Sequence, residues 1–201
     1  MSDLVIYDCE QGSREWLMAR LGVPSASRFS DVLAKGQGIT RKKYLLTLAG
    51  EAITGELSEV YTNKHMERGN VMEDEARQAY AFARDVDPAS IGFMRRGRIG
   101  ASPDSLVGED GLLEIKTKLP ALQLEVLERT TLPPEHKAQV QGQLLVSGRD
   151  YVDFVSYWPK LPIFIVRVER DEDYIKTLDQ ALADFIGELD TYITRYGVQA
   201  A

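Results

Sequence analysis

Cysteine is almost absent from this chain of 201 residues, in which Cys9 is the only one. A single cysteine excludes an internal disulfide and a zinc site built from cysteines, and it suits a reducing cytosol. Histidine is nearly as scarce, because His65 and His136 are the only two and lie too far apart in sequence for a zinc motif. The chain is therefore neither a disulfide scaffold nor a zinc protein of a familiar type.

Long apolar runs are missing as well. No uninterrupted apolar stretch is long enough to span a bilayer, and the first residues lack the basic and apolar regions of a signal peptide. Glycine-rich phosphate loops and a serine-nucleophile elbow are also not found. With 44% apolar and 27% charged residues, the composition is that of a globular protein, and the length predicts one domain over residues 1–201.

Positive charge is in deficit, since 31 Asp and Glu oppose 24 Lys and Arg and give a net charge of −7. This balance argues against a small basic protein that coats DNA, but not against a nuclease. The charge is also uneven, with seven basic and two acidic residues in 13–43 and eight acidic and two basic residues in 169–190. These segments are ordinarily solvated helix faces. The alternative is a basic front that binds an anion.

Apolar spacing, capping residues and prolines predict the order of the elements. The predicted helices run from caps at Ser13, Ser25 and Thr40, over 64–84 and 134–146, and from Asp171. The predicted strands cover residues 4–7, 91–94, 98–101, 112–117, 151–158 and 163–169. Helices, a mixed sheet with an intervening helix and a closing helix indicate an α/β or α+β fold.

Two carboxylates and a lysine form the most informative pattern. On a strand, Glu114 and Lys116 point to one face and Ile115 to the other. A hairpin after Asp104 brings that carboxylate beside Glu114. Such a group can hold a hard cation such as Mg²⁺, to which the Ile115 carbonyl could add an oxygen, with Lys116 as a general base or charge stabiliser. The structural alternative is a surface ion pair of Glu114 with Lys116 and a turn at Asp104.

Two helices carry further candidates. Glu73 is either a third carboxylate at the metals or an ordinary ion-pair partner of Arg77, four residues on. Gln139 and Gln143 have the same spacing in the helix over 134–146, which indicates a polar face turned towards a site.

Six short sequence blocks, taken in order, resemble a known family. They are Gly12–Trp16 with Arg20–Val23 and Ser25–Ser27, Gly69 with Glu73, Ala101–Asp104, Leu113–Lys116, Ala138–Gln141 and Val168–Asp171. In this order they resemble the phage lambda-type alkaline exonucleases of viral recombination, within the nuclease superfamily that has a proline-aspartate and an acid-x-lysine motif. The resemblance implies a restriction-endonuclease-like core, in which a mixed central sheet is flanked by helices.

The activity implied is a Mg²⁺-dependent 5′→3′ exonuclease on double-stranded DNA that releases mononucleotides and leaves 3′ single-stranded tails. Two Mg²⁺ ions, which Mn²⁺ could replace, would be held by Asp104, Glu114 and the Ile115 carbonyl, supported by Glu73. Lys116 would orient or deprotonate the attacking water. The residues implied for the 5′-terminal phosphate are Arg20, Ser27, Ser102, Gln139 and Lys64.

The resemblance also implies partners and a setting. These are DNA ends with a 5′-phosphate, a homotrimeric ring, a single-strand annealing protein, and the cytoplasm of a bacterial host for a gene of bacterial, phage or prophage origin. Ser105 departs from the family, which often has glycine after the proline-aspartate. Two alternatives stay open: a structure-specific endonuclease or junction resolvase on the same core, and a non-catalytic module that binds DNA ends.

Overall fold

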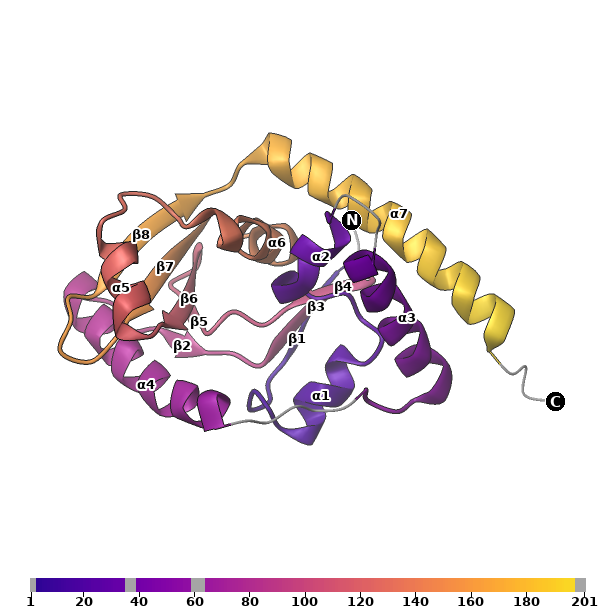
Figure 1. Ribbon diagram of the computed structural model, residues 1–201, viewed down its shortest axis with the longest axis horizontal. Coiled ribbons are helices and arrows are strands. Elements are labelled where there is room, and N and C mark those ends of the chain that lie inside the picture. Colours follow the sequence, from indigo (N-terminus) through magenta and orange to yellow (C-terminus); the bar gives the residue numbers. More distant parts are fainter. Residues whose placement is uncertain (1–2, 35–38, 59–63, 198–201) are drawn as a thin grey trace.

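Two β-sheets form the framework of the protein in the computed structural model, which describes residues 3–34, 39–58 and 64–197 (Figure 1). The side chains of the helix that starts at Lys64 are described from residue 72 onward. The strands are β1 (Leu4–Tyr7), β2 (Ala89–Ser90), β3 (Phe93–Arg96), β4 (Ile99–Ala101), β5 (Ser105–Val107), β6 (Gly111–Thr117), β7 (Tyr151–Tyr157) and β8 (Phe164–Glu169). The helices are α1 (Arg14–Arg20), α2 (Phe29–Val32), α3 (Ile39–Thr54), α4 (Lys64–Arg84), α5 (Pro120–Leu127), α6 (Lys137–Ser147) and α7 (Glu172–Tyr196), with 3-10 turns η1 (Ala26–Arg28) and η2 (Pro134–His136).

The larger sheet has the order β2-β5-β6-β7-β8, and the smaller one the order β1-β3-β4. Only β6 and β7 pair in parallel, and every other pair in the described sheets is antiparallel. The parallel pair needs a crossover, which α5 and α6 supply. Helices flank this mixed sheet, so the predicted α+β class is confirmed. No helix in the described part of the chain is long and apolar enough to cross a membrane.

Strand β6 separates two apolar layers, as its alternating sequence predicts. Leu112 belongs to the larger core, together with residues of α2, α3, α6 and α7. Leu113 and Ile115 belong to a second core with Ala76 and Tyr80 of α4. The sheet therefore lies between α4 on one face and α6 with α7 on the other.

Some elements differ from the prediction. The short strands β2 and β5 and the helix α5 were not predicted, because two or three residues carry no periodicity and the sequence of α5 lacks a regular polar face. Ser25 does not cap a helix with its side chain, since η1 and α2 follow it as two short turns. Helix α3 begins at Ile39, one residue before the predicted cap Thr40.

The acidic and basic segments of the sequence meet in space. Arg41 of α3 forms a bidentate ion pair with Glu188 of α7, with 2.8 and 2.9 Å between the guanidinium nitrogens and the carboxylate oxygens. Arg98, next to β4, pairs with Asp190 at 2.8 Å. Part of the basic front is therefore matched by the C-terminal helix, which Figure 1 shows along the outer side of α3.

Gly142 lets helix α6 approach α2 closely. A Cβ atom at this position would collide with the ring of Phe29, which is fully buried. We expect Gly142→Ala to lower the stability by about 2 kcal/mol despite the better helix propensity of alanine. For a chain of this size the melting temperature should fall by roughly 4–8 °C, as measured by circular dichroism.

The matched control is Gly187→Ala, at a helical glycine of α7 whose Cβ would meet nothing within 4 Å. This variant should melt at or slightly above the wild-type temperature. Equal melting temperatures of the two variants would show that the contact between α2 and α6 tolerates an extra methyl group.

Candidate active site

Asp104 and Glu114 are brought together by the hairpin of β5 and β6. The amide of Asp104 donates to the carbonyl of Leu113 at 3.0 Å, and the Asp104 carboxylate accepts a hydrogen bond from the amide of Ile115. The strand alternation places Glu114 and Lys116 on one face of β6, where their side chains form an ion pair. The predicted hairpin geometry is therefore present.

The side chain of Glu114 is only 2% exposed, and its carboxylate has three partners within the protein. Lys116 and the amide of Gln139 both reach Oε1, and the amide of Gln143 donates to Oε2. The i,i+4 spacing of the two glutamines brings both amides from α6 onto the same carboxylate. In the sequence, Gln143 only helped to indicate a polar helix face. Its hydrogen bond to Glu114 makes it a member of the site.

Arg77 of α4 links Glu73 to the start of β5. Its guanidinium donates to Glu73 at 2.7 Å, to Asp74 at 2.6 Å and to the hydroxyl of Ser105 at 3.0 Å. It also approaches the Asp104 carbonyl at 3.5 Å. The ion pair that was the structural alternative for Glu73 is thus present, but it lies beside Asp104 rather than on a free surface. Ser105, the departure from the family pattern, gives Arg77 an acceptor that glycine would lack.

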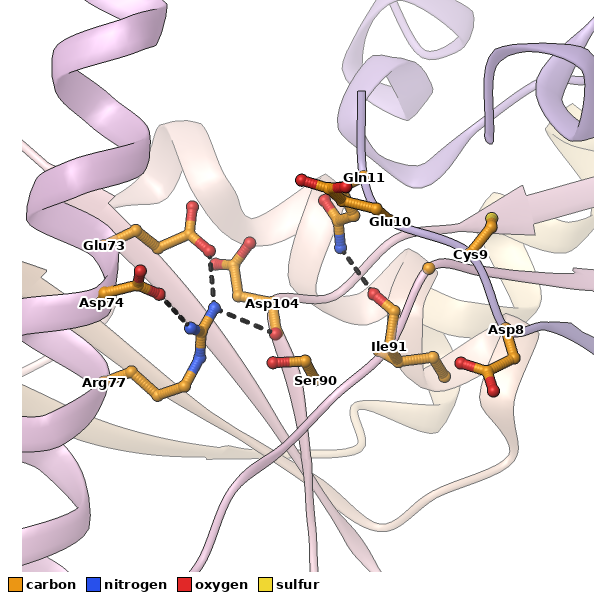
Figure 2. Close-up of a pocket in the computed structure, with 11 residues that line it drawn as sticks. Asp8, Cys9, Glu10, Gln11, Glu73, Asp74, Arg77, Ser90, Ile91 and Asp104 are labelled. Atoms are coloured by element: carbon orange, nitrogen blue, oxygen red, sulfur yellow. Dashed lines mark hydrogen bonds and ion pairs between the residues drawn. The ribbon is translucent and has the colours of Figure 1, made fainter. Parts of the chain in front are cut away.

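A cleft of about 450 Å³ opens over this group. Figure 2 shows Glu73, Asp74 and Arg77 on one side of Asp104, and the N-terminal segment with Gln11 on the other. The side chain of Gln11 donates to the carbonyls of Ile91 and Pro103, both at 2.9 Å, and so ties this segment to the residue that precedes Asp104. Five carboxylates line the cleft: Asp8, Glu10, Glu73, Asp74 and Asp104.

The electrostatics of the group show an excess of negative charge. Burial, followed by the neighbouring charges of Glu114 and Glu73, raises the pKa of Asp104 well above its usual value. Burial also raises the pKa of Glu73, against the effect of Arg77. Burial lowers the pKa of Lys116, but the carboxylates of Glu114 and Asp104 outweigh it, so the net shift is upward and the ammonium stays charged.

This donor set fits a hard divalent cation, because its ligands are carboxylate oxygens whose repulsion a cation would relieve. Within the described residues, however, no three Asp, Glu, His or Cys side chains are close enough together to form a complete metal centre. Glu73 is engaged by Arg77, and Asp104 and Glu114 accept hydrogen bonds from the protein. Water or substrate oxygens would have to complete the coordination, as is usual for Mg²⁺.

A second group of polar side chains lies just before Asp104 in the sequence. The hydroxyl of Ser102 accepts hydrogen bonds from the indole of Trp16 at 2.9 Å and from the guanidinium of Arg20 at 3.2 Å. Arg20 also donates to the hydroxyl of Ser25 at 3.3 Å, which lies 3.4 Å from that of Ser27. Arg20 stacks on the ring of Trp16 with 4.0 Å between its Cζ atom and the ring centroid.

Arg20 is a partly buried cation to which no carboxylate bonds among the described residues. Burial lowers the pKa of its guanidinium, although an arginine stays charged at physiological pH. A partly buried cation whose hydrogen-bond partners are neutral hydroxyls is expected to attract an anion, because partners of opposite charge compensate its desolvation. The hydroxyls of Ser102, Ser25 and Ser27 are suited to donate to the same anion.

The structure brings together most of the predicted site residues. Gln139 lies against Glu114 and makes no contact with Arg20 in the described part of the chain, so its predicted phosphate contact stays a prediction. The side chain of Lys64 lies outside the described residues. Four contributors were missing from the predicted site, namely Trp16, Ser25, Arg77 and Gln143.

The fold is similar to those of solved exonuclease structures. The chain is similar to an alkaline exonuclease from Laribacter hongkongensis, with 34% sequence identity, a TM-score of 0.84, and coverage of 91% of this chain and 95% of that one. The same values hold for that exonuclease in complex with dAMP. A phage-related exonuclease from Haemophilus somnus shares the fold at 15% identity and a TM-score of 0.66, over 86% of this chain and 96% of that one. No similar protein was found among curated proteins.

The sequence also matches the family model of the YqaJ-like viral recombinase domain over residues 15–150, which cover α1 to the end of α6 and so include both polar groups. The extent of this match and the 34% identity over almost the whole exonuclease chain show the family. The prediction of a nuclease is confirmed at this level, and the chain belongs to the YqaJ-like viral recombinase family.

Proposed function

We propose that this protein is a Mg²⁺-dependent 5′→3′ exonuclease that acts on double-stranded DNA ends, releases 5′-mononucleotides and leaves 3′ single-stranded tails. The observation that supports the proposal is that Arg20 and its serine partners lie next to the group of carboxylates and lysine. Ser102, which Arg20 grips, is only two residues from Asp104. A terminal 5′-phosphate bound by Arg20 would present the next phosphodiester to the Asp104 group, so each cut would release one nucleotide.

The residues of the site have distinct tasks. Divalent cations bound at Asp104 and Glu114 would supply Lewis-acid chemistry to the scissile phosphate and to the attacking water. Gln139 and Gln143 hold the Glu114 carboxylate in one orientation. Lys116 stays charged beside Glu114, which suits it to stabilise the negative charge of the transition state. As a general base it would first have to lose this proton, and both roles remain open to test.

One digestion assay tests the proposal. Linear duplex with 5′-phosphate ends, labelled at either the 5′ or the 3′ terminus, is incubated with Mg²⁺ and with EDTA. We expect mononucleotides to be released from 5′ ends only, and digestion to stop in EDTA. Release from 3′ ends, or equal digestion in EDTA, would contradict the proposal.

A covalently closed circle distinguishes the alternatives. An exonuclease needs an end and should leave a closed circle with an extruded cruciform intact, whereas a structure-specific endonuclease or junction resolvase would cut this circle at the junction. A module that only binds DNA ends would digest neither substrate. A homotrimeric ring and a single-strand annealing partner belong to the same proposal and rest on family resemblance. The mass of the protein in solution tests the ring.

A further inference from the structure

A second cavity, of about 580 Å³, includes Trp16, Arg20 and Ser25 of the polar group described above and extends from them along α3. Its walls come from α1, the segment after it, α3 and the turn that follows α3. Three cations line it, namely Arg20, Arg28 and Lys43. None of the proposed catalytic residues does so, and Figure 1 shows α3 and α4 at opposite flanks of the molecule.

The two outer cations are available to a ligand. Arg28 lies over the ring of Tyr44 with 4.7 Å between its Cζ atom and the ring centroid, and its Nε donates to Asp31. Its two terminal nitrogens have no partner among the described residues. Lys43 is exposed and has no hydrogen bond or ion pair to any described side chain. Asp31 and Tyr44 thus orient Arg28 and leave its terminal nitrogens free to bind.

Glu51 is the one acidic residue that lines the cavity, and its oxygens are already occupied. It accepts hydrogen bonds from the amide of Gly22 at 3.1 Å and from the backbone amide and the hydroxyl of Ser58. Arg20, Arg28 and Lys43 outnumber Glu51 and the Arg28 partner Asp31 by three to two, so the cavity favours an anion. Phosphate oxygens are the groups that Arg and Lys side chains bind in nucleic acids.

The cleft at Asp104 and the cavity at Arg20 have different linings, and this indicates which DNA strand could reach the cavity. In the proposed function, on which this inference rests, the cleaved strand ends at the phosphate held by Arg20. Beyond that phosphate the cleaved strand has no further nucleotides, so the only DNA that continues is the complementary strand. After each cut this strand is a single-stranded 3′ tail.

We propose that Arg28 and Lys43 form a phosphate subsite for the 3′ tail of the complementary strand, next to the pocket for the 5′-phosphate. The contacts are to the backbone and are therefore independent of sequence. They stabilise the protein on an end that it has already resected. The subsite favours tailed over blunt ends.

The test is equilibrium binding in EDTA, so that cleavage does not interfere. The probes are 5′-phosphorylated duplexes that are blunt or carry a 3′ thymidine tail, and a tailed duplex whose tail has neutral methylphosphonate linkages. The variants are R28Q/K43Q and the control K176Q, at an exposed lysine of α7. Anisotropy is recorded over a range of salt concentrations.

Wild type and K176Q should bind the charged tail about tenfold more tightly than the blunt end, and lose this gain with the neutral tail. R28Q/K43Q should bind all three probes alike. Its salt dependence on the tailed probe should fall by about 1.4 in the log–log slope, since a single-stranded phosphate contributes roughly 0.7. The preference for a 5′-phosphate over a 5′-hydroxyl should be unchanged in this variant.

Two results would overturn the proposal. One is an equal gain from the tail in R28Q/K43Q and wild type. The other is a loss of the 5′-phosphate preference in R28Q/K43Q, which would assign both residues to the terminal phosphate. Failure of the proposed function is seen separately, as a lack of 5′→3′ digestion by the wild-type protein.

Discussion

Lys116→Ala is expected to lower turnover on 5′-phosphorylated duplex by at least about a hundredfold while DNA affinity changes little. Lys116 pairs with the buried carboxylate of Glu114, so its ammonium lies within the carboxylate group and not on a separate binding surface. Single-turnover kinetics measure the chemical step, and anisotropy in EDTA measures binding. Turnover close to that of the wild type would exclude the residue from the reaction.

Lys116→Arg distinguishes the two roles that remain open. Arginine keeps the positive charge but is not deprotonated in proteins. If the lysine stabilises charge, this variant should retain more activity than the alanine variant. If the lysine acts as a general base, the two variants should be equally slow. Melting temperatures measured alongside would show whether either change also loosens the hairpin around Glu114.

Arg20→Gln is expected to remove the preference for 5′-phosphate ends. Charge-assisted hydrogen bonds of a guanidinium to a phosphate contribute about 1.5–3 kcal/mol, which corresponds to roughly 10- to 150-fold in affinity. The loss should be confined to phosphorylated ends, because a 5′-hydroxyl end lacks the anion. The measurement is kcat/KM for matched duplexes with 5′-phosphate or 5′-hydroxyl ends, for both proteins.

Arg20→Lys is the informative second variant, because lysine keeps the charge but lacks the planar fork that bridges Ser102 and Ser25. It should fall between wild type and Arg20→Gln on phosphorylated ends. Equal rates of wild-type protein on the two kinds of end would exclude a terminal phosphate pocket. Unchanged discrimination in Arg20→Gln would assign any such pocket to other residues.

The side-chain directions on strand β6 could be predicted from the sequence. The alternation of a strand places Glu114 and Lys116 on one face and Ile115 on the other, and the structure has this arrangement. The hairpin that brings Asp104 to the amide of Ile115 followed from the same local rules. Local periodicity is sufficient here because all of these residues lie within one turn and its two strands.

Contacts between segments that are distant in the sequence could not be predicted in this way. Arg77 could be paired with Glu73 from the sequence, but its hydrogen bond to Ser105 depends on where α4 crosses the sheet. Gln143 could be placed beside Gln139 on one helix face, but that this face meets Glu114 depends on the packing of α6. In both cases the sequence indicated a polar side chain on a helix face, but it did not show which distant residue that side chain contacts.

The charges of the protein also show which features depend on neighbouring residues and which depend on packing. The sequence by itself determined the strand alternation, the hairpin, the scarcity of zinc ligands and the separation of basic and acidic segments, since these depend on neighbouring residues. Only the tertiary structure decided that Arg41 is matched by Glu188, whereas Arg28 and Lys43 line a cavity with Arg20. The physical reason is that charge pairing depends on distance in space, and burial and proximity are set by how α3 packs between α7 and the segment that follows α1.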